Sequence, residues 1–361
     1  MLKILFITPN LSSGGAERQL VTLARSLKTQ GMQVEVLCYG KGDFYGHLLE
    51  EENIPVHWYI LDNYFLRVVK VRQIIRNGKF SEVISFLDTA NFLNNFSAMG
   101  GKKWRVITGE RSSNERTFST TKGKIFGWFQ RFSDVIVCNS NNAKRLWLSH
   151  YPRYRNKLTT IYNIVKLPRI NTEYIPKKDG RIHIIVIATY RYSKNPIGVI
   201  KALSLLNEEE KKKIKIDWYG RTEFAKGNTR AYYEAKAMVD LYKLDNVISL
   251  NESSKDIFEL INQADFVGLF SQFEGLPNAI CEGMMIGKPI IMTKVSDYDR
   301  LVDETNGFLC DWDDPESIRN SFRAAINTGQ ERLIEMGKSS LAKAKLLFSE
   351  EDIIKQWLSI L

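Results

Sequence analysis

The chain has 361 residues, 44% of them hydrophobic, and a net charge of +10. At about 150 residues per domain, this length predicts two domains with ordinary cores. The sequence has no run of roughly 18 apolar residues, which excludes a membrane-spanning helix. Four scattered cysteines without a C-x-x-C pair indicate free thiols in a reducing cytoplasm rather than a disulfide framework.

In the first half of the chain, apolar strand-like runs alternate with amphipathic segments. This alternation predicts a doubly wound parallel α/β sheet. The opening Met1–Ile7 is too short for a signal peptide and reads as part of the first strand. Helical periodicity predicts helices over Ala16–Gln30 and Phe65–Asn77. The expected strands are Lys3–Thr8, Gln33–Tyr39, Val83–Phe86, Arg105–Thr108 and Val135–Asn139.

Two of these strand ends carry candidate functional residues. Gly14 and Gly15 follow the first strand and precede a long helix, so the backbone there suits a phosphate, although glycine is also common in such turns for geometry alone. Glu110 and Arg111 follow the fourth strand. They are candidates for binding a hydroxyl and a phosphate, or for a structural ion pair.

A basic and aromatic segment follows at Thr121–Phe132. Ile125, Phe129 and Phe132 have helical spacing and are predicted to face the core. The remaining large or charged residues of the segment suit the surface of an anionic bilayer, or simply an ordinary amphipathic helix. These residues are Lys122, Lys124, Phe126, Trp128 and Arg131.

Charge is distributed unevenly along the chain. Residues 1–170 hold 25 basic and 12 acidic residues, whereas residues 171–361 hold 26 and 29. This asymmetry indicates an anionic partner for the first domain: nucleic acid, anionic lipid or a phosphorylated small molecule. Around Asn156–Pro176 the composition changes, and we expect the connection there. The predicted domains are 1–165 and 166–345, with a terminal helix over 346–361 that could return to the first domain.

A second series of strands and helices follows the connection. The first strand of this series leads into Arg191 and Lys194, two cations that could clamp a diphosphate. The charged stretch Asn207–Lys215 is predicted as a helix end and an exposed loop. The expected strands are Ile182–Ala188, Ile214–Tyr219, Val247–Leu250, Phe266–Phe270 and Pro289–Thr293.

Two glutamates eight positions apart, Glu274 and Glu282, follow the buried strand at Phe266–Phe270. The residues between them suit a strand-to-helix turn, with Pro277 near the first helical position. Ligands of open α/β sheets bind at this edge, where a helix start favours an anion and carboxylates suit sugar hydroxyls. The E-x7-E stretch resembles the donor-site motif of retaining GT-B glycosyltransferases of family four, as does the Gly-Gly-Ala-Glu-Arg run that starts at Gly14.

The resemblance implies two Rossmann-like domains that face each other across a cleft, and transfer of a hexose-type sugar with retention of configuration. The donor would be a nucleotide diphosphate sugar, with UDP expected. By resemblance, Arg191, Lys194 and Glu274 are the catalytic residues; Arg191 is displaced from the usual Gly-Arg position, which Ala188-Thr189 occupies here. Donor-binding residues would be Gly14, Gly15, Gly275, Leu276, Pro277, Asn278 and Glu282.

On the acceptor side, the resemblance implies a different kind of site. Many family members carry a histidine where this chain has Glu110 and Arg111. The sequence at these positions resembles the variant found in glycosyltransferases that make surface polysaccharides, such as O-antigen, capsule or exopolysaccharide. The acceptor is then expected to be a saccharide linked to polyprenyl diphosphate, with the enzyme cytoplasmic and peripheral on the membrane's inner face. No metal-ligand spacing occurs, so neither a metal nor another cofactor is expected.

Two other functional classes are weighed against this interpretation. A nucleic-acid-binding module would explain the basic first domain, but no recognised DNA or RNA motif accompanies the charge. A nicotinamide-dependent oxidoreductase would share the sheet topology, but the G-x-G-x-x-G fingerprint is missing.

Overall fold

A computed structural model describes residues 2–111, 114–167, 179–223 and 227–361. The chain divides into two compact units: unit 1 comprises Met1–Lys166 and Ser349–Leu361, and unit 2 comprises Leu167–Phe348. The expected connection, Asn156–Pro176, overlaps residues 168–178, which lie outside the described residues. The chain therefore passes into unit 2 and returns to unit 1 for its final helix.

Unit 1 contains a seven-stranded sheet in the order β3-β2-β1-β4-β5-β6-β7. All of its strand pairs are parallel, so the carboxyl ends of the strands share one edge. The strands are β1 (Lys3–Thr8), β2 (Gln33–Cys38), β3 (Val56–Trp58), β4 (Glu82–Phe86), β5 (Arg105–Glu110), β6 (Val135–Cys138) and β7 (Leu158–Thr160).

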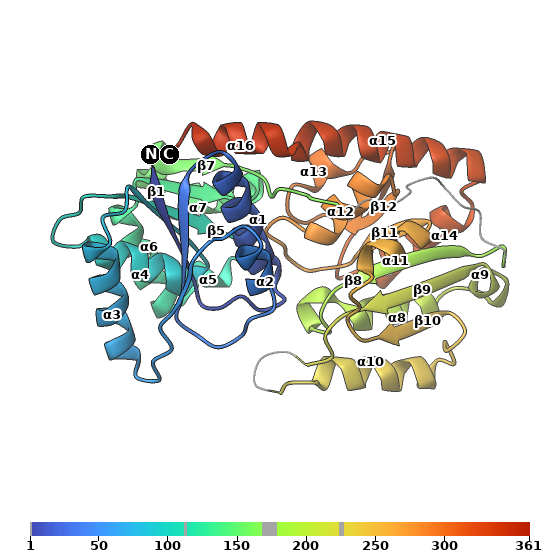
Figure 1. The fold of residues 1–361 in the computed structure, drawn as a ribbon. Helices are drawn as coiled ribbons and strands as arrows, with labels where there is room; N and C mark the ends of the chain where they lie inside the picture. Colours follow the sequence, from blue (N-terminus) through green and yellow to red (C-terminus); the bar gives the residue numbers. More distant parts are fainter. Residues whose placement is uncertain (1, 112–113, 168–178, 224–226) are drawn as a thin grey trace. The chain divides into compact units, whose positions relative to one another are not determined.

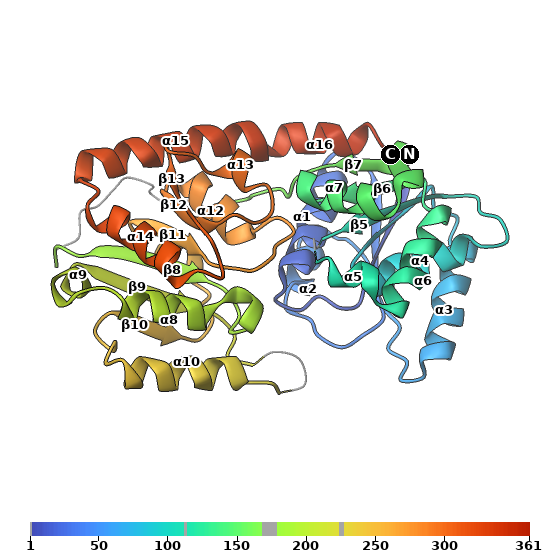
Figure 2. The same ribbon diagram turned by 180° about the vertical axis from the view of Figure 1, so that it is seen from behind.

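Helices cover both faces of this sheet. Side chains along each strand alternate between the faces, so a strand of apolar residues makes both faces apolar. Ile4 and Phe6 of β1 pack on the face covered by α1, whereas Leu5 and Ile7 pack on the face covered by α3 and α4. Figures 1 and 2 show α3, α4 and α6 grouped on one flank of the sheet. The helices are α1 (Gly15–Thr29), α2 (Gly46–Glu50), α3 (Tyr64–Asn77), α4 (Asp88–Ala98), α5 (Arg116–Ser119), α6 (Thr121–Phe129) and α7 (Asn141–His150), with 3-10 turns η1 (Gln130–Phe132) and η2 (Pro152–Lys157).

The final helix, α16 (Glu350–Leu358), belongs to the core of unit 1. Its residues Ile353, Ile354 and Trp357 are buried on the α1 face of the sheet. The Ser349 hydroxyl caps its first turn by accepting from the Asp352 amide. A hydrogen bond of 2.7 Å from the Ser26 hydroxyl to Glu350 fixes the start of α16 to α1.

Unit 2 contains a six-stranded parallel sheet in the order β10-β9-β8-β11-β12-β13. Its strands are β8 (Ile182–Ile187), β9 (Ile214–Tyr219), β10 (Ile248–Asn251), β11 (Phe266–Leu269), β12 (Ile290–Thr293) and β13 (Gly307–Cys310). Its helices are α8 (Pro196–Ser204), α9 (Glu208–Lys212), α10 (Arg230–Leu241), α11 (Ile257–Gln263), α12 (Asn278–Ile286), α13 (Tyr298–Leu301), α14 (Pro315–Ile326) and α15 (Gln330–Phe348), with the 3-10 turn η3 (Tyr192–Lys194).

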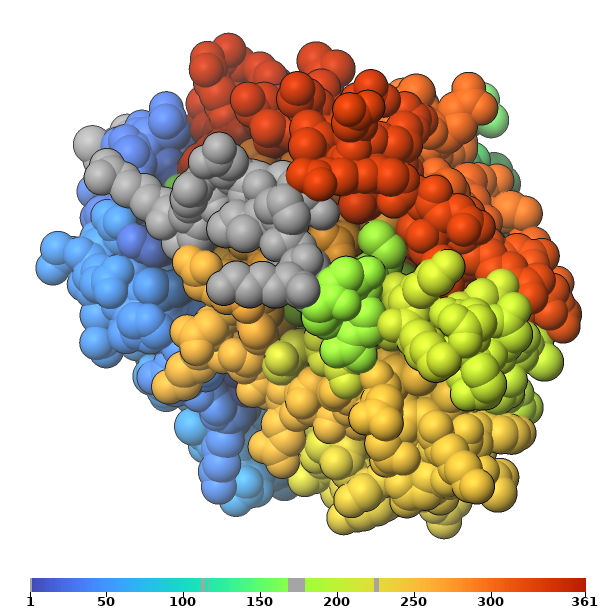
Figure 3. Space-filling view, turned by 90° about the vertical axis from the view of Figure 1, so that its right-hand side faces the viewer, coloured from blue at the N-terminus to red at the C-terminus, as the bar shows by residue number. Residues whose placement is uncertain are grey.

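The charged stretch Asn207–Lys215 differs from its prediction as a helix end and loop. It forms the separate helix α9, because Asn207 and Glu210 make a capping box that satisfies the first amides, before the chain enters β9. Glu210 also accepts a hydrogen bond of 2.7 Å from Arg323 of α14. Figure 3 shows the yellow-green surface of α9 beside the orange-red surface of the α14 region.

All four cysteines are free and buried. Across the described ranges, no helix combines the length and the hydropathy that a membrane span requires.

Candidate active site

In unit 2, the loop after β8 is held rigidly before it reaches Lys194. The Tyr190 hydroxyl donates to the Trp218 and Asn251 carbonyls at 3.1 and 2.9 Å, beside the ends of β9 and β10. Asn195 has a left-handed backbone (φ 64°), a conformation that asparagine tolerates better than most residues. Its side chain caps α8 through the Gly198 amide and donates to the Trp312 carbonyl at 2.7 Å. The segment from Arg191 to Lys194 is thereby fixed at both ends.

The Glu274 loop lies between β11 and α12. Pro277 immediately precedes the first helical residue, and its carbonyl accepts from the Ile280 and Cys281 amides at 3.1 and 3.2 Å. Gly275, Leu276 and Pro277 are buried, and Asn278 is half-buried. The Ser296 hydroxyl bonds to the Gly275 carbonyl, which anchors the turn to the loop after β12. The E-x7-E segment therefore forms the expected strand-to-helix turn.

The two loops meet through Lys194 and Glu274. The Lys194 ammonium forms an ion pair with Glu274 Oε1, and the Ser271 hydroxyl donates to the same oxygen at 2.6 Å. A backbone hydrogen bond of 2.8 Å from the Gln272 amide to the Ser193 carbonyl joins the loops directly. Residues 80 positions apart in sequence are thus brought to one edge of the sheet. The sequence did not reveal the contribution of Ser271.

Arg191 lies at the same edge and is half-buried. Burial lowers the pKa of its guanidinium and the nearby Arg221 lowers it further, whereas the Glu274 carboxylate opposes both effects. Arg191 and Lys194 thus both lie near the Glu274 carboxylate at this edge.

Glu282 is the fifth residue of α12 and only 6% exposed. Gly283, the next residue, packs so closely on β11 that an added Cβ would lie 2.6 Å from a Val267 methyl carbon. This close contact fixes α12 against the strand, and with it the position of the Glu282 backbone.

In unit 1, Gly14 and Gly15 form the start of α1. Gly14 is its N-cap residue, and an added Cβ would lie 2.1 Å from the Glu17 carboxylate, so a side chain there would displace Glu17. Leu20, Leu23, Ala24 and Leu27, which recur at helical spacing along α1, are buried. The start of α1 is fixed to the chain after β7 by Gln19, whose amide bonds to both the N–H and the carbonyl of Ile164 at 3.0 Å.

Glu110 ends β5 and is 6% exposed, so its carboxylate depends on hydrogen bonds rather than on water. Its Oε1 accepts from the Asn91 amide at 3.0 Å and from the Gln130 amide at 2.7 Å. Burial, with a smaller contribution from the charge of Asp88, raises the pKa of Glu110 to about 8. Within the described residues, no hydrogen bond reaches its second oxygen.

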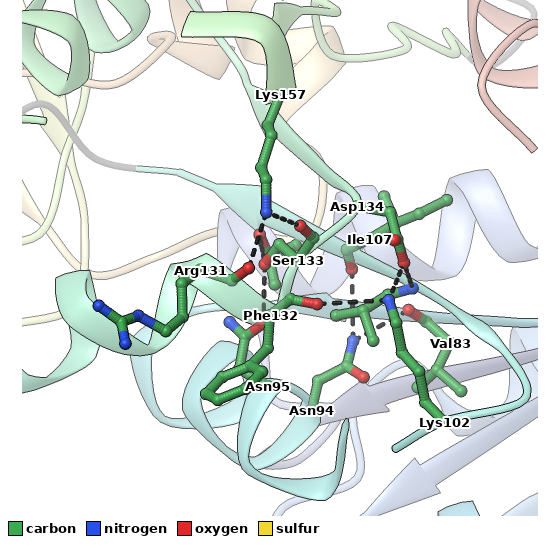
Figure 4. Close-up of polar contacts among 12 residues, drawn as sticks. Val83, Asn94, Asn95, Lys102, Ile107, Arg131, Phe132, Ser133, Asp134 and Lys157 are labelled. Atoms are coloured by element: carbon green, nitrogen blue, oxygen red, sulfur yellow. Dashed lines mark hydrogen bonds and ion pairs between the residues drawn. The ribbon is translucent and has the colours of Figure 1, made fainter. Parts of the chain in front are cut away.

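Two further buried amides of α4, Asn94 and Asn95, join this helix to β4 and to the chain after η1. The Asn94 amide donates to the Val83 carbonyl at 2.9 Å, and Asn95 Oδ1 accepts from the Ser133 hydroxyl at 2.8 Å. Figure 4 shows Asn94 and Asn95 side by side, facing β4, β5 and the chain that follows η1. The same close-up shows Lys157 donating to the Arg131 and Ser133 carbonyls at 2.7 and 2.6 Å. Asn95 also donates to the Gln130 side chain at 3.1 Å, so it fixes one of the two hydrogen-bond partners of Glu110.

Arg111 does not form the alternative structural ion pair with Glu110. Its guanidinium carbon lies 3.5 Å from the centre of the Phe86 ring, and Nη1 donates to the Asn163 side chain at 3.0 Å. Its buried Nε finds no acceptor among the described residues. Burial lowers the pKa of Arg111 to about 9. Both side chains lie at the carboxyl edge of the sheet, but each has its own partners.

The predicted core stripe of α6 is wrong at one position. Ile125 is 48% exposed, whereas Phe126, predicted off the stripe, stacks on Phe92 of α4 with ring centres 4.8 Å apart. The helix turns this face inward because Phe129 contacts the same ring at 4.8 Å. Trp128 remains 40% exposed, with the Arg131 guanidinium 4.0 Å from the centre of its indole ring system.

Comparison with known proteins gives matches along almost the whole chain. Residues 13–169 match the family model described as Glycosyltransferase Family 4, and residues 170–340 match Glycosyl transferases group 1. A Campylobacter jejuni enzyme is 25% identical over all of this chain and 98% of its own. It is named GalNAc-alpha-(1->4)-GalNAc-alpha-(1->3)-diNAcBac-PP-undecaprenol alpha-1,4-N-acetyl-D-galactosaminyltransferase.

An uncharacterized glycosyltransferase of Haemophilus influenzae is also 25% identical, over the full length of both chains. Among solved structures, Anabaena Alr3699/HepE in complex with UDP-glucose matches with a TM-score of 0.86, at 20% identity over 100% of both chains. Because this match covers the whole chain, both units have the same fold as the corresponding parts of that structure.

Proposed function

Since the chain belongs to the GT-B glycosyltransferases of the family-four type, we propose that it transfers a hexose-type sugar from a UDP-sugar to a lipid-linked saccharide, with retention of configuration. The oxidoreductase and nucleic-acid alternatives are set aside, because the family matches cover both domains. A UDP donor is supported by the UDP-glucose bound to Alr3699/HepE. An acceptor on a lipid diphosphate is supported by the undecaprenol-linked substrate in the name of the Campylobacter enzyme.

The contact between Lys194 and Glu274 carries the proposal for the donor. In the reaction, the bond between the anomeric carbon and the diphosphate breaks, and its electron pair leaves with the diphosphate. Lys194 and Arg191 would stabilise the charge that develops there, which is the largest contribution expected from such a site. Glu274 would hold Lys194 in place and contact the transferred sugar.

The remaining donor contacts are proposed from the resemblance to the family. Glu282 would accept hydrogen bonds from the ribose hydroxyls. The turn from Gly275 to Asn278, with the helix start behind it, would contact the sugar and the phosphates. Gly14 and Gly15 of unit 1 would approach the diphosphate through their backbone. In this scheme cations and amides supply the electrostatic stabilisation, so we propose that the reaction needs no metal ion.

Glu110 and Arg111 are proposed as the acceptor-side residues. The attacking hydroxyl of the acceptor would form the new bond to the anomeric carbon, and its proton would pass to the Glu110 carboxylate. Glu110 would accept a hydrogen bond from that hydroxyl through the oxygen that Asn91 and Gln130 leave open. Arg111 would contact a phosphate group, because its Nε lacks an acceptor among the described residues.

Membrane attachment is proposed for α6, in keeping with synthesis of a surface polysaccharide at the inner face of the membrane. Ile125 and Trp128 are exposed there beside Arg131, and the Lys122 ammonium lies 5.2 Å from the Phe126 ring centre. Exposed aromatic and basic groups on one helix suit an anionic bilayer surface. Flotation with anionic vesicles tests this part: complete recovery in the unbound fraction at low salt contradicts it.

A transfer assay tests the enzymatic proposal. Purified protein, a panel of UDP-sugars and a polyprenyl-diphosphate saccharide should yield UDP and an extended saccharide. The Glu282→Ala variant should weaken UDP binding while its unfolding temperature without ligand changes little. If UDP-sugars neither bind nor react, the proposed function is wrong.

A further inference from the structure

The turn between β3 and α3 exposes an unusual group of large apolar side chains. Ile60, Tyr64, Phe65 and Leu66, here called the α3 tip, are 43%, 52%, 72% and 55% exposed. Apolar residues exposed singly are common, but four within seven positions form a patch of the kind that marks an interaction site. The predicted and observed helix both include Phe65, but periodicity gave no indication of its exposure.

The tip is the continuation of the buried face of α3. Tyr64 and Phe65 precede the buried Val68 by four and three positions, so they lie on the same side of the helix. The sheet and α4 cover Val68, Val71 and Ile75, yet leave this first turn uncovered. The apolar face of α3 therefore extends beyond the core that it helps to build.

Hydrogen bonds hold the tip in a defined conformation. The Asn63 side chain caps α3 by accepting from the Leu66 amide at 3.1 Å. Arg67 donates to the Leu61 carbonyl from both Nε and Nη2, at 3.0 and 2.6 Å. The turn is therefore structured in the free protein, and its apolar groups are presented outward rather than collapsed onto the surface.

The helix behind the tip is cationic. It carries Arg67, Lys70, Arg72 and Arg76 and no carboxylate. Arg72 and Arg76 donate to carbonyls at the end of α4, including that of Ser97 at 2.8 and 3.1 Å. Carbonyl acceptors do not cancel the positive charge, and no ion pair to these four cations occurs among the described residues. An anionic surface would compensate it.

The position of the tip relates it to the proposed acceptor side. The tip follows β3, and Glu110 ends β5 of the same parallel sheet, so both lie at its carboxyl edge. α3 and α6 both pack against α4, and Figures 1 and 2 show the three helices on one flank. A surface that contacts α3 and α6 would therefore lie next to this edge.

We propose that the α3 tip inserts into the headgroup region of an anionic bilayer, so that a membrane-anchored acceptor is held at the carboxyl edge of unit 1. The apolar tip supplies insertion and the four cations supply attraction, the combination that binds interfacial helices to anionic lipid. A second copy of this chain is a poorer occupant, because symmetric pairing of the tips would bring the cationic helices together. The part of the proposal that concerns the acceptor rests on the proposed function; insertion itself does not.

The Phe65→Glu variant of the full chain tests insertion, with vesicles of phosphatidylcholine and phosphatidylglycerol. We expect the vesicle-bound fraction to fall about tenfold, because a charge replaces the most exposed apolar group of the tip. Leu346→Glu is the matched control: Leu346 is 83% exposed on α15 of unit 2, so its substitution should leave binding unchanged. Unfolding temperatures should match the wild type for both variants.

Insertion depth gives a second, independent measurement. Because all four native cysteines are buried, a thiol-reactive environment-sensitive dye should label Phe65→Cys selectively. Vesicles should shift its emission to the blue, and should leave the dye on Leu346→Cys unchanged. Undiminished vesicle binding of Phe65→Glu, or no emission shift at position 65, overturns the proposal. So does a dye response that follows protein concentration without vesicles, which would indicate self-association.

A water-soluble acceptor separates this proposal from the enzymatic one. Phe65→Glu should keep transfer to a soluble saccharide acceptor and lose it toward the same saccharide on a lipid in vesicles. If the wild-type protein binds vesicles through the tip but never binds a UDP-sugar, the proposed function fails and the insertion stands.

Discussion

Charged side chains have different partners at the two candidate sites, the donor edge of unit 2 and the acceptor edge of unit 1. In unit 2, the Glu274 carboxylate is paired with a lysine and accepts from the Ser271 hydroxyl. In unit 1, the Glu110 carboxylate is held only by neutral amides, and Arg111 lies on an aromatic ring. The Glu274 carboxylate is fixed in place by its charged partner, whereas burial raises the pKa of Glu110 to about 8, so Glu110 takes up a proton near neutral pH.

The difference suits two different tasks. Stabilising a departing diphosphate requires fixed charges that need no rearrangement as the reaction proceeds. Assisting an attacking hydroxyl requires a group whose protonation state changes near the working pH. The predictions below test whether the two edges divide the work in this way.

The largest effect is expected for Lys194→Ala. Loss of the ammonium removes charge stabilisation from the diphosphate and removes the ion pair of the largely buried Glu274. We expect transfer to fall by about 10²–10³-fold, measured as initial rates of UDP release. Lys212→Ala is the matched control, because Lys212 pairs with Glu209 on the surface of the same unit. Equal losses in the two variants would remove the special role of Lys194.

Glu110→Gln should change the pH dependence of transfer. The pKa of about 8 implies that wild-type activity rises as pH increases through this range, because the carboxylate form accepts the hydroxyl's hydrogen bond. The variant should be about 10²-fold slower above pH 8 and lack this rise. Gln keeps an acceptor for Asn91 and Gln130, so the fold should persist. UDP affinity should be unchanged; a rate profile identical to wild type would contradict the assignment.

Glu82→Gln tests whether burial of a carboxylate in unit 1 affects transfer even when that carboxylate lies away from the candidate acceptor site. Glu82 starts β4, at the opposite edge of the same sheet, and burial raises its pKa to about 7. A folded-state pKa above the unfolded value favours the protonated native state, so its stabilising contribution is complete below about pH 4.5 and is lost as pH rises through 7. Between pH 5 and pH 8, the wild type should therefore lose about 2 kcal/mol more unfolding free energy than the variant does.

Denaturant unfolding at the two pH values measures this difference, and transfer by Glu82→Gln should match the wild type. A large loss of activity in this variant would show that burial of a carboxylate in unit 1, rather than its place at the carboxyl edge, determines the effect of Glu110→Gln.

Several features of both edges could be predicted from sequence, and others could not. The run from Phe266 to Glu282 specifies a strand, a turn and a helix through local chemistry alone, and the structure agrees. The partners of Glu110 could not be found in this way, because Asn91 and Gln130 are 19 and 20 positions away. Their approach depends on how α4 and η1 pack on the sheet.

Periodicity also has a limit that two helices illustrate. The spacing that placed Ile125 in the core was wrong, since a short helix with aromatic residues on several sides can turn more than one face inward. For α3 the spacing was right, but it cannot tell where the core ends, so the exposed tip remained hidden. The short strands β3 and β13 were also missed. β3 contains His57 and β13 begins at Gly307, so neither stands out as a continuous apolar run.

The smallest effect is expected for removal of metal ions. If the cations and amides at the donor edge supply the electrostatic stabilisation, chelation with EDTA should change the transfer rate by less than about twofold. Restoration of a lost rate by Mg²⁺ or Mn²⁺ would show that the donor edge binds its diphosphate through a metal ion instead.

The most direct test of the central claim is calorimetric titration of UDP-sugars into the wild-type protein and Glu282→Ala. The account predicts saturable binding of at least one UDP-sugar to the wild type, and affinity weakened at least about tenfold in the variant, because the ribose loses a buried carboxylate acceptor. Equal affinities for the two proteins would contradict the assignment of the E-x7-E carboxylates to the donor.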